Sequence, residues 1–144
     1  MRVMMYLIPI VLLAFTSCKK DKEGALRYFE VGMKHTPSDW RDSSFVVATS
    51  NPALINQIEQ QLLLSVDKRS HLNGAIVAGD GGYNKNGSHS FSWHFDEKDW
   101  FFASLSVEIY DGRAYTDLDL NKSYWQNTMK RFAPWGSYVK REIR

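Results

Sequence analysis

The stretch SNPALINQIEQQLLL, residues 50–64, indicates how this chain folds. Ser50 or Asn51 can accept hydrogen bonds from the first free amides of a helix, and Pro52 stands at the first helical position, where its missing N–H costs nothing. The apolar residues that follow recur at helical spacing on one face, namely Leu54, Ile55, Ile58 and Leu62. We therefore expect a helix over residues 52–64 whose apolar face packs on a sheet.

The segments on either side of this helix are rich in β-branched and aromatic residues, which favour strands. Runs of this kind occupy residues 26–33, 44–49, 73–80, 90–95, 100–110 and 136–143. In SFSWHF the residues Phe91, Trp93 and Phe95 alternate with polar ones, which is typical of a half-buried strand and places Trp93 in the core.

Two further elements complete the predicted fold. Asp111-Gly112 is a type I′ hairpin signal, so we expect the chain to turn there and return as a strand through RAYTDL. Helical spacing of aromatic and apolar residues predicts a second helix at about 121–131, ended by Ala133-Pro134, because the residue before a proline is pushed out of the helical region. The expected fold is α+β, with five or six mainly antiparallel strands packed with two helices, at about 52–64 and 121–131.

The first 17 residues predict a lipoprotein signal peptide. Arg2 precedes an apolar run from Val3 to Phe15, which is too short to cross a bilayer of about 30 Å as a helix. Phe15-Thr16-Ser17-Cys18 is similar to a bacterial lipobox, in which the cysteine is acylated and becomes the new N-terminus. Cys18 is the only cysteine, so it has no intramolecular disulfide partner. An ordinary signal peptide that happens to contain a cysteine is the alternative.

A polar segment separates Cys18 from the first predicted strand. Lys19 to Gly24 form a charged run suited to a flexible tether. We therefore divide the chain into a signal peptide (1–17), a lipidated cysteine with its tether (18–26) and a single α+β domain (27–144). Several acyl chains on Cys18 would give stable membrane anchoring, because each buried methylene contributes about 0.8 kcal/mol. We expect the protein in the bacterial cell envelope, on the outer membrane, facing the periplasm or the surroundings.

Composition and motifs argue against several functional classes. Lysine and arginine number 18 against 16 acidic residues, and no basic stripe suggests nucleic acid as a partner. GYNKNG fails the calcium-loop count and the four histidines lack zinc spacing, so we expect neither a metal nor a cofactor. No GxSxG motif is present. A small envelope hydrolase that uses His94 with Glu108, or Asp80, remains an alternative, but isolated carboxylates and histidines are far more often structural, and we expect no enzyme.

Aromatic residues near loops suggest a binding function instead. Planar rings with nearby amide and imidazole groups suit stacking on sugars or a protein interface. Trp100 and Trp135 lie next to loop positions and are better surface candidates than Trp93. The candidate binding residues are Tyr83, Asn84, Asn86, His94, Trp100 and Trp135. The expected partner is a protein, for instance a protease that the domain inhibits, or a glycan; a purely structural envelope protein is the third interpretation.

Several motifs spread over about residues 27–144 carry a family resemblance. In order, they are RYFEV, TSNPALINQIEQQLL, GDGGYN, FSWHF, VEIYDG, YW and FAPWGS. They resemble a family of small secreted domains labelled calmodulin-binding-protein-related, after the N-terminal domain of an amoebal protein. The resemblance implies a shared fold and assigns no catalytic or ligand residue.

The family pattern and this chain differ at two positions. Members often carry a cysteine before the DG turn and another before the PW pair, which the resemblance implies to be a disulfide; Tyr110 and Ala133 stand there in this chain. The family label also implies calmodulin binding. A calmodulin target is normally a basic amphipathic helix, and the nearest such segment, 124–132, is broken by Pro134, so we do not expect calmodulin as a partner.

Overall fold

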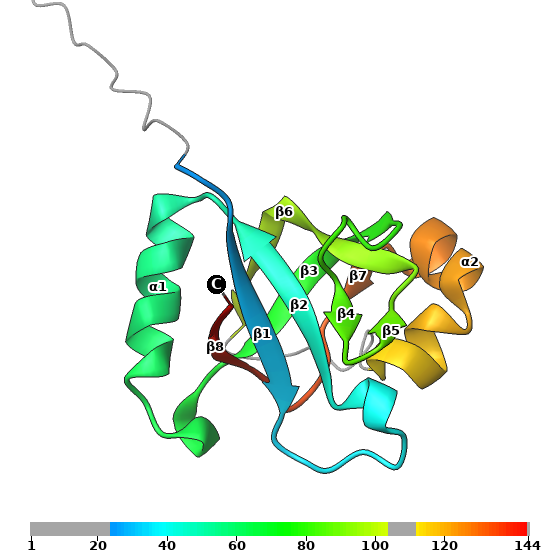
Figure 1. Ribbon diagram of the computed structural model, residues 1–144, viewed down its shortest axis with the longest axis horizontal. Coiled ribbons are helices and arrows are strands. Elements are labelled where there is room, and N and C mark those ends of the chain that lie inside the picture. Colours follow the sequence, from blue (N-terminus) through cyan, green and yellow to red (C-terminus); the bar gives the residue numbers. More distant parts are fainter. Residues whose placement is uncertain (1–23, 104–111, 144) are drawn as a thin grey trace, which may run out of the picture.

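Figure 1 shows the computed structural model, which describes residues 24–103 and 112–143. The strands among these residues are β1 (Arg27–Met33), β2 (Ser44–Thr49), β3 (His71–Ala78), β4 (Lys85–Asn86), β5 (His89–Ser90), β6 (Trp93–Ala103), β7 (Arg131–Phe132) and β8 (Ser137–Ile143). The helical elements are α1 (Pro52–Leu62), α2 (Lys122–Tyr124), short 3-10 turns at Trp40–Asp42 and Val66–Lys68, and π-helical turns at Ala114–Asp119 and Trp125–Met129. The predicted signal peptide, Cys18 and Glu108 lie outside the described residues.

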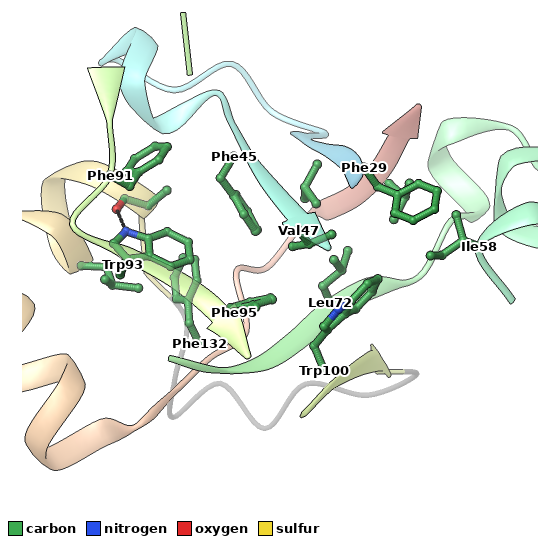
Figure 2. Close-up of a cluster of buried hydrophobic side chains, with 14 of the residues drawn as sticks. Phe29, Phe45, Val47, Ile58, Leu72, Phe91, Trp93, Phe95, Trp100 and Phe132 are labelled. Atoms are coloured by element: carbon green, nitrogen blue, oxygen red, sulfur yellow. Dashed lines mark hydrogen bonds between the residues drawn. The ribbon is translucent and has the colours of Figure 1, made fainter. Parts of the chain in front are cut away.

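Two antiparallel sheets of three strands enclose one aromatic core. Their strand orders are β2-β1-β8 and β6-β3-β7, and β4 and β5 form a separate short hairpin. Phe45 of β2 contacts Trp93 and Phe95 of the opposite sheet, with ring centroids 5.4 and 5.7 Å apart. Figure 2 shows these rings together with Phe132, whose centroid lies 6.0 Å from that of Phe45. The prediction of an α+β fold of mainly antiparallel strands is confirmed, and Trp93 is in the core as expected.

Helix α1 forms as its sequence predicts and ends two residues early, at Leu62. The Asn51 side chain accepts hydrogen bonds from the amides of Ala53 and Leu54, at 2.9 and 3.3 Å, directly before Pro52. Leu54 and Ile58 are buried, and the helix lies beside the β2-β1-β8 sheet (Figure 1). Among residues 24–103 and 112–143, no helix is long and apolar enough to cross a membrane.

The segment RAYTDL is helical, so the prediction of a returning strand is wrong. Ala114 and Leu118, four residues apart, are both buried in the π-helical turn. The buried carboxylate of Asp42 accepts hydrogen bonds from the amides of Tyr115 and Thr116 and from the Thr116 hydroxyl, at 2.7, 3.0 and 2.9 Å. A distant acceptor therefore satisfies the free amides at the start of this turn, as a local capping residue would.

The second helical segment also differs from its predicted bounds. It runs from Lys122 to Met129 as α2 followed by a π-helical turn, and ends at Lys130, whose φ of 61° is left-handed. The amide of Lys130 bonds the carbonyl of Trp125 at 2.6 Å. Phe132 was expected within the helical spacing, but it lies in β7 opposite Gly74, where the strand carries its ring into the core. Pro134 therefore follows a helix that has already ended.

A bulge in the β3–β6 pairing explains why Trp100 is buried. The sequence predicts separate strands at 90–95 and 100–110, but β6 continues through both and shifts register opposite Gly74 and Ile76. Because a bulge adds one residue, it reverses which side chains of the strand face the core. Phe95 and Trp100 both point inward, and Trp100 is only 4% exposed, so its prediction as a surface residue is wrong. Gly74 permits this packing, since a Cβ there would lie 2.4 Å from the Phe95 ring.

Two side chains connect the sheets where β2 and β6 adjoin. Asn84, fully buried, accepts a hydrogen bond from the amide of Val46 at 2.8 Å and donates one to the carbonyl of Trp93 at 2.7 Å. The indole of Trp100 donates to the carbonyl of Ala48 at 2.8 Å. Backbone groups on the outer edge of β2 therefore bond to side chains, because β2 pairs with only one strand of its sheet.

Replacing Asn84 tests this connection. Asn84→Ala leaves a buried amide and a buried carbonyl without partners, each at a cost of about 1–3 kcal/mol, so the free energy of unfolding should fall by roughly 2–5 kcal/mol in urea titrations. Asn127→Ala is the matched control, because that exposed amide bonds only the Ser123 hydroxyl, at 3.2 Å; it should change stability by less than about 0.5 kcal/mol. Similar small losses in both variants would contradict the proposed role of Asn84.

Candidate functional site

A groove lies between the outer face of the β2-β1-β8 sheet and the segment that contains β4. It consists of two adjoining hollows of about 360 and 410 Å³, which share Val46, Lys85 and Ile143. The other lining residues are Tyr28, Gly81, Gly82 and Tyr83 in the first hollow, and Glu30, Ser44, Asn86, Gly87 and Arg141 in the second. Volumes of this size are typical of small-ligand sites.

Strand register brings the floor of the groove together. Tyr28 pairs with Ile143, and Glu30 pairs with Val46 on one side and Arg141 on the other. Directly opposed residues of antiparallel strands project from the same face. This face is opposite to the one that buries Phe29 and Val31 in the core, so the groove and the core use alternate residues of β1.

The first hollow has an aromatic corner formed by two tyrosines. The rings of Tyr28 and Tyr83 are 5.3 Å apart and tilted by 58°. The Tyr83 hydroxyl donates to Glu97 Oε1 at 3.0 Å and to the Phe95 carbonyl at 3.2 Å, while its ring meets that of His94 edge-on at 5.7 Å. Burial, together with the negative charge and the hydrogen bond of Glu97, raises the pKa of Tyr83 above its ordinary 10, so the phenol stays protonated.

Local backbone geometry holds the Tyr83 ring in place. Gly81 and Gly82 have φ angles of 63° and 79°, a left-handed conformation that side chains other than glycine rarely adopt. A Cβ at Gly81 would lie 2.8 Å from the Tyr83 ring and 3.0 Å from His94. Asp80 Oδ1 accepts the amide of Gly82 at 2.9 Å, and buried Asn84 follows Tyr83 directly. The wall of the groove is thus fixed from both sides of the tyrosine.

The second hollow is charged and has more cationic than anionic groups. Glu30 accepts from Lys140 Nζ at 2.9 Å and from Arg141 Nε at 2.6 Å. Burial alone would raise the pKa of Glu30, but these two hydrogen bonds outweigh it and hold that pKa below its ordinary 4.5. Lys85 is exposed on the opposite wall and forms no ion pair with another described residue. Glu30 is therefore neutralised, and Lys85 adds a positive charge.

The structure brings together only part of the predicted binding set. Tyr83 and Asn86 line the groove, but the Asn86 amide is engaged with the Trp40 carbonyl, at 2.8 Å, and with the Ser43 hydroxyl, at 3.1 Å. Asn84 and His94 are buried behind Tyr83, so their side chains support the wall. Trp100 is in the core.

Trp135 lies apart from the groove. It is 51% exposed and borders a separate hollow of about 290 Å³ with His35, Arg113 and Asp117. Its ring lies 5.6 Å from that of His71. The prediction that Trp135 is a surface residue is therefore confirmed, whereas its part in binding stays a prediction.

Sequence reasoning missed most of the groove floor. Tyr28 and Glu30 alternate with buried residues in RYFEV, so a strict period-two reading would have placed both on the outer face. No sequence signal brings Arg141, more than 100 residues away, beside Glu30; the β1–β8 pairing does so.

The residues of the alternative hydrolase have structural roles in the described part of the chain. His94 Nδ1 lies 2.7 Å from the Gly79 carbonyl, and Asp80 Oδ1 bonds the Gly82 amide. Glu108 lies outside the described residues, so its predicted pairing with His94 is untested. No group of three or more histidine, cysteine or acidic residues in 24–103 and 112–143 is placed to hold a metal ion.

A serine, a histidine and an aspartate do meet elsewhere, in the wrong order for a catalytic triad. Asp119 accepts from the hydroxyl and the amide of Ser92, both at 2.6 Å, and lies 3.0 Å from His89 Nε2. The carboxylate therefore stands between the hydroxyl and the imidazole, whereas nucleophilic catalysis needs the imidazole to contact the hydroxyl. This cluster ties β5 to the π-helical turn at Ala114–Asp119.

Comparison with known proteins identifies a family. The model of the family described as the N-terminal domain of calmodulin-binding-protein-related proteins matches residues 25–144, which is nearly the whole predicted domain. This is the family that the aromatic motifs resemble. No curated protein and no solved structure matches the chain.

The charge network in the groove predicts a pH-dependent contribution to stability. Because the pKa of Glu30 is lowered in the folded protein, its ion pairs stabilise the fold above about pH 4.5, and this stabilisation is lost as the pH falls through the folded-state pKa. Glu30→Gln should therefore be less stable than wild type at pH 7, and the difference should shrink towards pH 3 in urea titrations. An equal difference at both pH values would contradict this role of Glu30.

Proposed function

We propose that this chain, which belongs to the family of calmodulin-binding-protein-related N-terminal domains, is a non-catalytic binding domain held at the cell envelope by lipid on Cys18. Its partner is a protein or a glycan, and it binds in the groove between the β2-β1-β8 sheet and the β4 segment. The observation that carries the proposal is the preformed groove itself, with an aromatic corner at one end and charged groups at the other.

The position of the groove suits an anchored protein. Tyr28 is the second residue of β1, so the aromatic corner lies next to the point where the tether enters the domain. Arg27 stands nine positions after Cys18, and a fully extended chain of that length spans roughly 30 Å. A domain anchored at Cys18 would therefore hold its groove close to the membrane surface, facing ligands of the envelope.

The anchor is tested by replacing its attachment atom. Cys18→Ser should abolish incorporation of radiolabelled palmitate in cells and move the protein from the membrane to the soluble fraction, because the hydroxyl cannot form the thioether that carries the lipid. Lys22→Ser, in the same tether, should leave both readouts unchanged. Label and membrane fractionation that persist in Cys18→Ser would contradict the anchor.

The binding function is tested by charge reversal at the groove. The full chain in detergent serves as bait for envelope extract and for a glycan array, and ligands are scored only when Lys85→Glu loses them. Lys68→Glu is the matched control, since Lys68 is also exposed but lies in the 3-10 turn at Val66–Lys68, away from the groove. We expect at least one ligand whose capture falls tenfold or more in Lys85→Glu alone. The proposal would be contradicted if neither variant lost a ligand, or if both lost the same ligands equally.

A further inference from the structure

We infer that the ligand of the groove is an acidic sugar, one whose ring carries a carboxylate, with the ring against the tyrosine corner and the carboxylate at Lys85 and Arg141. This inference rests on the binding function proposed above and names the class of ligand. Its three supports are the shape of the aromatic corner, the charge balance of the second hollow and the occupied edge of β2.

The aromatic corner suits a saturated ring with hydroxyl groups. The Tyr83 ring is held by its hydroxyl bonds to Glu97 and the Phe95 carbonyl, so its position does not depend on the ligand. Tyr28, tilted by 58° against it, is held only by ring contact and forms no hydrogen bond to another described residue. A pyranose could lay its C–H face on one ring and accept or donate a hydrogen bond at the Tyr28 hydroxyl. The tilt leaves no parallel slot for a flat aromatic ligand.

The charge balance of the second hollow favours an anion of low charge. Lys140 and Arg141 together neutralise Glu30, yet the Arg141 side chain is 69% exposed and bonds Glu30 through Nε alone, at 2.6 Å. Its terminal guanidinium nitrogens can therefore donate to a second partner, and Lys85 faces them across the hollow. Two such donors match one carboxylate. They provide too little charge for a nucleic acid backbone.

The edge of β2 excludes the commonest way in which a sheet binds an extended peptide. Strand addition requires a row of free amides and carbonyls along an edge strand. On β2 the Val46 amide bonds the buried Asn84 side chain, and the Ala48 carbonyl bonds the Trp100 indole. A peptide at this groove would meet side chains of the sheet face without main-chain hydrogen bonds. The groove therefore offers a sugar more specific contacts than it offers a strand.

Paired probes that differ only in charge test this inference. The full chain in detergent is titrated by calorimetry with oligogalacturonate and with its methyl ester, and with 3′-sialyllactose and lactose. We expect at least one acidic probe to bind tenfold or more tightly than its uncharged counterpart, and the preference to weaken as sodium chloride rises from about 50 to about 500 mM. Equal binding of acidic and uncharged probes would overturn the inference.

Variants locate the site and separate the two proposals. Lys85→Gln and Tyr83→Ala should each weaken the acidic probe at least tenfold, whereas Lys68→Gln and Tyr83→Phe should weaken it less than twofold. Because Tyr83→Ala could loosen the wall, Lys85→Gln, at an exposed position, decides the charge contribution. Binding of a protein or a neutral glycan that depends on Lys85 would overturn the acidic-sugar inference and leave the binding function standing. No ligand that depends on Lys85 would overturn both.

Discussion

The buried amide of Asn84 is the interaction on which the rest of this structure depends. One side chain satisfies a backbone amide of β2 and a backbone carbonyl of β6, and so connects the edges of two sheets that share no ladder at that point. It also fixes the residues on either side of it. Tyr83 and Lys85, which stand over the outer face of β2, lie in the groove because Asn84 is held in the core.

The same joint links the core to the groove. The bulge in β6 turns Trp100 inward, and its indole occupies the second exposed carbonyl on the edge of β2. An edge strand with free backbone groups invites pairing with other chains, so these two side chains also protect the domain from association. A wall that is ordered before binding loses less conformational entropy when a ligand arrives, which favours a small ligand that makes few contacts.

The sequence predicted the elements whose signals are local. Helix α1 carries its own cap in Asn51 and its own apolar face, and β1, β2 and β8 are marked by β-branched and aromatic residues. It failed where a distant residue decides the local structure. Asp42 caps the segment RAYTDL as a helix, although the hairpin signal favours a strand, and the bulge opposite Gly74 reverses the exposure of Trp100. The candidate site was predicted in part for the same reason: Tyr83 lies in a recognisable loop, whereas Tyr28, Glu30 and Arg141 converge only through strand pairing.

Hydrogen exchange of the Val46 amide, followed by NMR in the ligand-free protein, tests the central claim most directly. This amide lies on the outer edge of β2 and bonds only the Asn84 side chain. If Asn84 joins the sheets and fixes the groove wall, the amide should exchange as slowly as amides within the β1–β2 ladder, which open only on global unfolding. Exchange at the rate of a solvent-exposed loop would show that the joint opens freely, and would contradict a preformed groove.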